Sequence, residues 1–224
     1  MSMHETVEVT CPKCGKVSPF VIWSSINTQL DPEMKEKVRT GEAFLFTCPE
    51  CGDQNSVDYG FLYHQMEDKI MIHYANSDEN FEEMFKFYVD PPKSNDSDID
   101  MIMDMAQEGY INRIVRSKNE VLEKLAIFDA GLDDRVIEIC KLMFYLKVAE
   151  QVKSELVYAL FYTNDEGEHC IEYKFEDNLA TVTVTDEMYK DISEMFEGKF
   201  PEEREANIVI NMNWALEVFK SQHD

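Results

Sequence analysis

The sequence contains two near-identical cysteine motifs, Thr-Cys-Pro-Lys-Cys-Gly at residues 10–15 and Thr-Cys-Pro-Glu-Cys-Gly at residues 47–52. Each motif places two residues between its cysteines, so that both thiolates of one turn can face one metal ion. Proline stiffens the turn by fixing φ, and the glycine allows the positive φ with which the chain leaves it. The repetition therefore predicts one metal site, formed by Cys11, Cys14, Cys48 and Cys51.

Zinc is the metal that this ligand set favours. Four thiolates complete a tetrahedron at Zn–S distances of about 2.3 Å and leave no position for water or substrate, so the site is predicted to be structural. Iron is the less favoured alternative, because tetrahedral sulfur ligation suits it as well. A thioredoxin-type redox pair fits poorly, since the motif occurs twice and neither copy is predicted to join a strand to a helix.

Together with residues 30–46 between them and the aromatic-rich residues 59–74 after them, the two motifs resemble the CpXC domain proteins of bacteria and archaea. The resemblance covers residues 8–125. It implies metal-binding cysteines and a zinc-ribbon-like fold. It implies no activity, because the family is functionally uncharacterised.

The hydrophobic pattern and the turn residues outline the elements of both halves. In the first half they predict strands at residues 5–10 and 17–22, a helix between Asp31 and Gly41, a strand at 44–46, a hairpin at 59–74 and a short helix at 79–88. In the second half they predict helices at 117–131 and from Asp133, strands at 156–162, 170–175 and 180–184, and helices at 186–196 and 208–220.

These elements define an α+β protein: an N-terminal zinc ribbon with an inserted helix, a helical middle, and a C-terminal antiparallel β-meander with helices. The predicted division is a CpXC-like zinc-ribbon domain with an extension at residues 1–128, and a C-terminal α+β region at 129–224. Cys140 and Cys170 stand apart from the motifs and are predicted to pack in the core as small apolar residues. The acidic segment from Asp96 to Asp104 lacks the glycine and glutamate of a calcium loop and is predicted to be solvated.

Charge and composition exclude several classes of function. The chain has 21 basic and 45 acidic residues, a net charge of −24. Even residues 1–75 carry 6 basic and 11 acidic residues, so nucleic acid is not an expected partner. The longest apolar run, residues 156–162, is too short for a membrane span, and the first residues lack a secretory pattern. A cytoplasmic location is therefore expected.

The favoured function is a non-catalytic interaction module that binds another protein. In this interpretation zinc stabilises a small sheet, and exposed aromatic residues near Trp23, Tyr59 or Tyr63 contact the partner. The alternative is an enzyme whose site combines acidic residues with His64 or His73, remote from the zinc. No phosphate loop and no common hydrolase signature occurs in the sequence, and the sequence leaves both interpretations open.

Overall fold

A computed structural model of the 224-residue chain describes residues 2–90, 109–149, 152, 154–203 and 205–222. The chain divides into two compact units, residues 1–118 and 119–224, which are described in turn. Both units combine helices with sheet, which confirms the predicted α+β class. The predicted acidic segment from Asp96 to Asp104 lies outside the described residues. No helix among the described residues is long and apolar enough to cross a membrane.

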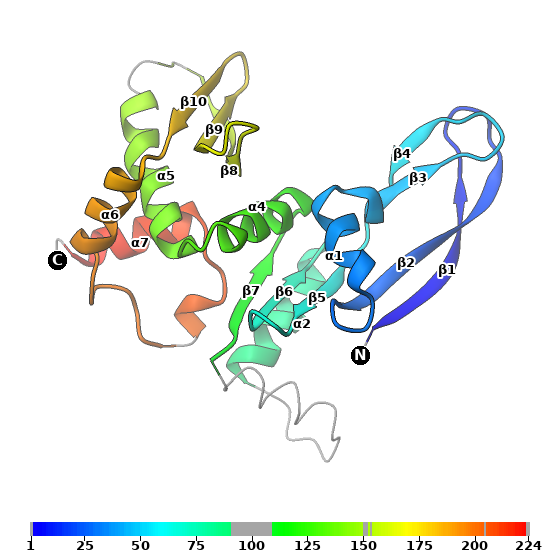
Figure 1. The fold of residues 1–224 in the computed structure, drawn as a ribbon, viewed down its shortest axis with the longest axis horizontal. Coiled ribbons are helices and arrows are strands. Elements are labelled where there is room, and N and C mark those ends of the chain that lie inside the picture. Colours follow the sequence, from blue (N-terminus) through cyan, green and yellow to red (C-terminus); the bar gives the residue numbers. More distant parts are fainter. Residues whose placement is uncertain (1, 91–108, 150–151, 153, 204, 223–224) are drawn as a thin grey trace. The chain divides into compact units, whose positions relative to one another are not determined.

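A five-stranded mixed sheet organises the N-terminal unit (Figure 1). Its order is β1-β2-β5-β6-β7, with antiparallel pairs β1–β2 and β5–β6 and parallel pairs β2–β5 and β6–β7. Each parallel pair needs a connection that leaves the sheet and returns. The strands are β1 (Met3–Thr10), β2 (Val17–Asn27), β5 (Phe61–Gln65), β6 (Ile70–Tyr74) and β7 (Ile111–Val115).

The connection from β2 to β5 contains the helix predicted between the two cysteine motifs. Helix α1 (Pro32–Arg39) begins with proline in its first turn, where no intrahelical N–H donor is needed. A short 3₁₀ turn, η1 (Glu42–Phe44), leads into the antiparallel pair β3 (Leu45–Thr47) and β4 (Gln54–Ser56). The second cysteine motif forms the turn of this small hairpin.

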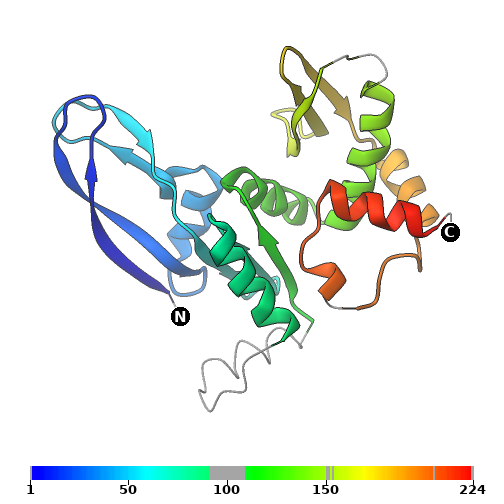
Figure 2. The ribbon, with the colours of Figure 1, turned by 180° about the vertical axis from the view of Figure 1, so that it is seen from behind.

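Helices lie on both faces of the five-stranded sheet. Helix α1 lies in front of the sheet in Figure 1, and α2 (Asp78–Val89) lies behind it and comes forward in Figure 2. On one face Arg39 of α1 donates to the Tyr63 hydroxyl at 2.7 Å. On the other face the Tyr88 hydroxyl of α2 lies 2.7 Å from Nε2 of His73. The sheet is therefore buried on both sides along β5 and β6.

The C-terminal unit packs helices against a three-stranded antiparallel sheet with the order β10-β9-β8. Consecutive strands pair, as expected for the predicted meander. Its core is formed by the apolar face of the sheet, with Phe161, Ile171 and Tyr173, and by buried residues of the long helix α5. The elements are α4 (Lys118–Asp129), α5 (Asp134–Ala149), β8 (Leu156–Thr163), β9 (His169–Phe175), β10 (Leu179–Thr183), α6 (Asp186–Met195), the 3₁₀ turn η2 (Glu205–Asn207) and α7 (Met212–Ser221).

Several features differ from the sequence-based expectations, among them the short strand β4, where no strand was predicted. Strand β7 was not predicted, because Asn112 and Arg113 interrupt its apolar alternation, yet both are buried beside β6. Helix α7 begins at Met212 rather than at Ile208. The Asn211 side chain accepts the first free amides of the helix and so fixes its start, while Ile208 packs as a buried residue before it.

Candidate metal centre

The two cysteine motifs fold into equivalent turns. In the first, the Cys11 amide donates to the Lys16 carbonyl at 2.9 Å and the Gly15 amide to the Cys11 carbonyl at 2.9 Å. In the second, Cys48 and Gly52 repeat this pattern at 2.8 and 2.9 Å. Both glycines adopt the left-handed conformation, with φ of 73° and 71°. The sequence repeat therefore has a structural counterpart, as the motif predicted.

The turns bring the four thiols together. The Sγ atoms of Cys11 and Cys51 are 3.7 Å apart, as are those of Cys14 and Cys48. All four Sγ atoms lie within 4.8 Å of one another and could hold a metal ion. A tetrahedron with centre-to-ligand distances of about 2.3 Å has edges of about 3.8 Å, so the two short distances fit a single ion bound by four sulfurs.

The surroundings divide the ligands into an inner and an outer pair. Cys11 and Cys48 are 1% exposed and pack with Phe46, whereas Cys14 and Cys51 face solvent. The ring of Phe46 meets that of Phe20 edge to face, with centroids 6.0 Å apart. This cluster is too small to stabilise the end of the β1–β2 and β3–β4 hairpins by apolar burial alone.

Backbone amides are directed at the sulfurs, as expected for turns that stabilise thiolates. Hydrogen bonds from the amides of Cys51 and Glu50 lower the pKa of Cys48 to about 7. The Asp53 amide also favours the Cys51 thiolate, but partial loss of hydration of its sulfur inside the cluster and the neighbouring thiols outweigh it and raise the pKa of Cys51 to about 12. Four adjacent thiols therefore cannot all ionise without a cation.

The family comparison matches this geometry. Residues 9–141 match the model of the CpXC protein family, which covers more than half of the chain and includes both cysteine turns. The chain belongs to the CpXC family. This confirms the resemblance drawn from the two motifs. No curated protein and no solved structure matches this CpXC protein.

The two histidines considered for an enzyme site are both buried. His64 lies 3.2 Å from the Tyr110 hydroxyl through Nε2, and His73 contacts Tyr88. Burial lowers the pKa of His73 to about 4, so this imidazole is neutral at physiological pH. Among the described residues, no hydrogen bond or ion pair joins either histidine to a carboxylate. Burial lowers the pKa of His64, and the nearby Glu67 carboxylate opposes this through its charge without a hydrogen bond between the two.

Two of the three aromatic residues expected to contact a partner are not at the surface. Tyr63 is fully buried, and Tyr59 is buried with its hydroxyl donating to the Ala43 carbonyl at 2.8 Å. The expectation of exposure was wrong for both. Strand alternation does not reveal that α1 covers Tyr63, and Tyr59 lies before β5, where it packs against Phe44 and Phe61. Trp23 is half-buried, with its ring 4.8 Å from that of His4.

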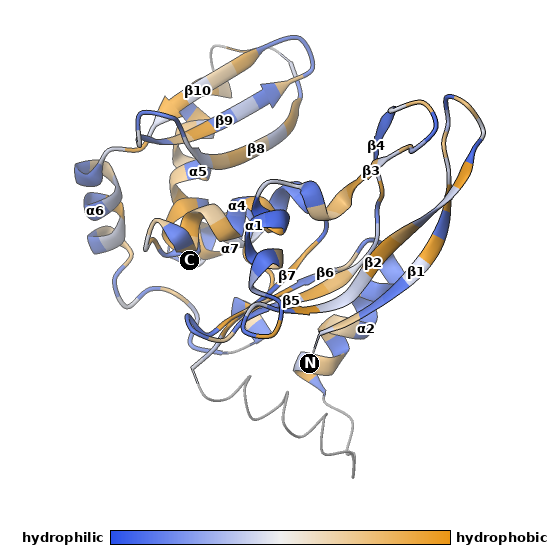
Figure 3. Ribbon diagram, turned by 45° about the vertical axis from the view of Figure 1, so that its right-hand side comes forward, coloured by the Kyte–Doolittle hydropathy of each residue, from blue (hydrophilic) through white to orange (hydrophobic). Residues whose placement is uncertain are grey.

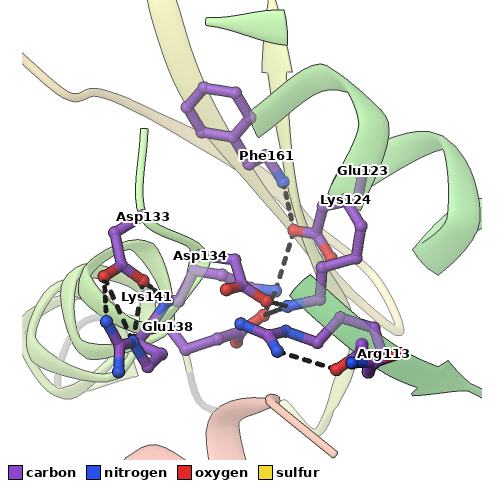
Figure 4. Close-up of polar contacts among 10 residues, drawn as sticks. Arg113, Glu123, Lys124, Asp133, Asp134, Glu138, Lys141 and Phe161 are labelled. Carbon is purple, nitrogen blue, oxygen red and sulfur yellow. Dashed lines mark hydrogen bonds and ion pairs between the residues drawn. The ribbon is translucent and has the colours of Figure 1, made fainter. Parts of the chain in front are cut away.

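Sequence reasoning did not anticipate a network of buried charges in the C-terminal unit (Figure 4). Lys141 Nζ lies 2.8 Å from Glu123 Oε1 and 3.1 Å from Glu138 Oε1. Lys124 Nζ lies 3.0 Å from Asp134 and 3.1 Å from Glu138. All five side chains are at most 5% exposed. The alternation of acidic and basic residues along α4 and α5 could have indicated ion pairs between them. Charged residues at helical spacing ordinarily lie on a solvated face, however, and so do not predict burial.

The two remaining cysteines are buried, as predicted. Cys140 lies in the core of the C-terminal unit, where burial raises the pKa of its thiol to about 12. Cys170, on β9, is 3% exposed. A buried thiol is a poor nucleophile, so of the six cysteines only the clustered four are placed to hold a metal ion.

Proposed function

We propose that Cys11, Cys14, Cys48 and Cys51 bind one zinc ion, which closes a zinc ribbon at the end of the β1–β2 and β3–β4 hairpins. The observation that carries this proposal is the set of four Sγ atoms within 4.8 Å, with two distances close to the edge of a zinc–sulfur tetrahedron. Four thiolates leave no open position, so the ion has a structural role. A cytoplasmic setting would keep the unligated thiols reduced.

In this proposal the zinc-stabilised unit is a non-catalytic module that binds another protein. The support is an apolar stripe on β2, where alternate residues Val17, Val21 and Trp23 share one side of the strand. Val17 and Val21 are 46% and 42% exposed, and Trp23 is half-buried. This stripe replaces Tyr59 and Tyr63 as the contact surface. A partner protein suits it better than nucleic acid, because the surrounding charge is negative.

Metal analysis of the purified chain, combined with hydrogen exchange, tests the zinc proposal. The wild-type protein, prepared under reducing conditions, is expected to contain one zinc per chain. Cys14→Ser removes an exposed ligand with little loss of packing and is expected to lose the zinc and the amide protection of residues 5–57. Cys170→Ser replaces a thiol of the other unit and is expected to keep both. A metal-free wild type, or unchanged protection in Cys14→Ser, contradicts the proposal.

The interaction surface is tested by affinity purification from the native host. Val21→Glu places a charge in the stripe and is expected to remove the co-purifying partner while zinc remains bound. Gln29→Glu, at an exposed position just after β2, is the matched control and is expected to retain it. Equal recovery of a partner with both variants would place the contact elsewhere.

A further inference from the structure

The two edges of the three-stranded sheet in the C-terminal unit differ in how they are protected. Strand β8 has a register shift between Leu156 and Tyr158, and the amide of Phe161 donates to the buried Glu123 carboxylate at 2.6 Å. A bulge and an occupied backbone donor are both devices that prevent a further strand from pairing. The β8 edge is therefore closed to another chain.

Strand β10 has none of these devices. Its sequence, Leu-Ala-Thr-Val-Thr, carries no charge and no proline, and it pairs with β9 without a register shift. The edge strand of the N-terminal unit makes a useful contrast, since β1 carries Glu5 and Glu8 and has a register shift after Met3. An uncharged, regular edge is the type that accepts another strand.

The backbone groups available on β10 follow from its pairing with β9. The Phe175 amide donates to the Asn178 carbonyl at 2.9 Å, and the Val184 amide to the His169 carbonyl at 2.7 Å. Because backbone groups alternate in direction along an antiparallel ladder, those of Leu179, Thr181 and Thr183 point away from β9. Within the described residues β10 is the last strand of its sheet. The side chains of these three residues are exposed, that of Leu179 to 57%.

Acidic residues flank this edge at both ends. Exposed Glu176 and Asp177 precede β10, and exposed Asp186 and Glu187 follow it. Figure 3 colours the strand itself in orange and pale shades, without the deep blue of charged residues. A second copy pairing antiparallel about Thr181 would place Glu176 opposite Asp186 of the other copy, which is repulsive. The charges therefore favour a basic partner over a second copy of this chain.

We propose that the β10 edge binds an extended peptide segment of a partner protein, with apolar and β-branched residues in its centre and lysine or arginine at both ends. The backbone groups of Leu179, Thr181 and Thr183 pair with the segment, and the flanking acidic residues contact its basic ends. The inference concerns the C-terminal unit and does not rest on zinc binding.

The test uses the full chain and the labelled synthetic peptide Arg-Lys-Val-Thr-Val-Thr-Val-Lys-Arg, with binding followed by fluorescence anisotropy. Thr181→Pro removes an outward N–H donor that no described residue accepts, and is expected to weaken binding about tenfold or more. Thr181→Val keeps the donor and is expected to bind within about twofold of the wild type. The pair Glu176→Gln and Asp177→Asn is expected to weaken binding about fivefold at low salt and much less at about 0.5 M salt.

Hydrogen exchange on the wild-type chain gives an independent measurement. The peptide is expected to protect the amides of Thr181 and Thr183, whereas β9 amides remain unchanged. If the β9 amides of Thr181→Pro are less protected from exchange even without peptide, that variant is misfolded, and the proposal is judged from the hydrogen exchange of the wild-type chain with peptide. Absence of peptide binding, equal binding by Thr181→Pro and Thr181→Val, or equal binding of a peptide with glutamate at both ends would overturn the proposal. Dimerisation through β10 without peptide would overturn the choice of partner.

Discussion

Replacing Lys141 with methionine is expected to destabilise the C-terminal unit by about 3–5 kcal/mol, the range for removing one partner of a buried ion pair. Lys141 contacts Glu123 at 2.8 Å and Glu138 at 3.1 Å, and the three side chains are 5%, 2% and 1% exposed. Glu138 would keep Lys124 as a partner. Glu123 would keep the Phe161 amide and a more distant attraction to Lys124, so most of the cost is one buried carboxylate without a cation in direct contact.

The pKa directions agree with this assignment. Burial disfavours the charged form of Lys141, but the carboxylates of Glu123 and Glu138 outweigh it and raise the pKa of the ammonium. Burial is the main cause that raises the pKa of Glu123, and Lys141 is the main influence that lowers it. Removing the ammonium therefore leaves Glu123 to be protonated in the folded state, which limits the loss of stability without abolishing it.

Hydrogen exchange of the β9 amides measures the effect in this unit alone. A loss of about 3–5 kcal/mol corresponds to a fall in protection of about two to four orders of magnitude. Lys147→Met on the exposed side of α5 is the matched control and is expected to cost less than about 0.5 kcal/mol. Adding Glu123→Gln removes the unpaired charge and keeps an acceptor for Phe161, so the double variant is expected to recover at least half of the loss. A cost equal to that of Lys147→Met, or no recovery in the double variant, would refute the reasoning.

Two further predictions concern the N-terminal unit, and a third concerns the whole chain. His73 has a pKa of about 4 in the folded chain against about 6.5 when unfolded. Its contribution of about 3 kcal/mol to the free energy of unfolding is therefore complete above pH 6.5 and is lost as the pH falls towards 4. Denaturant titrations at a series of pH values should show that the free energy of unfolding falls less steeply with decreasing pH in His73→Gln than in the wild type. Phe46→Ala empties a site that is 3% exposed beside Cys11 and Cys48 and is expected to cost about 3–5 kcal/mol and to weaken zinc binding, measured by chelator competition. The chain is expected not to bind duplex or single-stranded nucleic acid at about 150 mM salt, and micromolar binding in an anisotropy titration would contradict this.

Local signals predicted those parts of the fold that are decided by neighbouring residues. The doubled cysteine motif predicted two equivalent turns, because a turn with proline and glycine is determined within six residues. Pro32 predicted the start of α1 for the same reason. The N-cap residues of α2 and α6, Ser77 and Thr185, accept hydrogen bonds from the first turns of their helices, although neither cap was predicted.

The features that were missed depend on residues far apart in the chain. Strand β7 is recognisable only as the parallel neighbour of β6, since Asn112 and Arg113 are polar and their burial depends on what packs against them. Tyrosine is common at exposed strand positions, yet Tyr63 is covered by Arg39, which lies 24 residues earlier in the chain. The charged residues of α4 and α5 are spaced as on a helix face that contacts water. They can be buried only because the acidic and basic side chains of the two helices form ion pairs with one another.

The parallel pairing of β2 with β5 has a consequence for the rate of folding. Asn27 pairs with His64, and the chain between them contains α1 and the second cysteine turn. Closing such a long connection is entropically costly, and contacts between distant residues slow folding. A metal bridge between the two turns would hold Cys14 and Cys48 together before β5 reaches the sheet. The loop that remains to be closed when β5 pairs with β2 would then be shorter. A zinc ion bound there would accelerate assembly of the sheet as well as stabilise its end, and newly made chains would then fold more slowly when zinc is scarce.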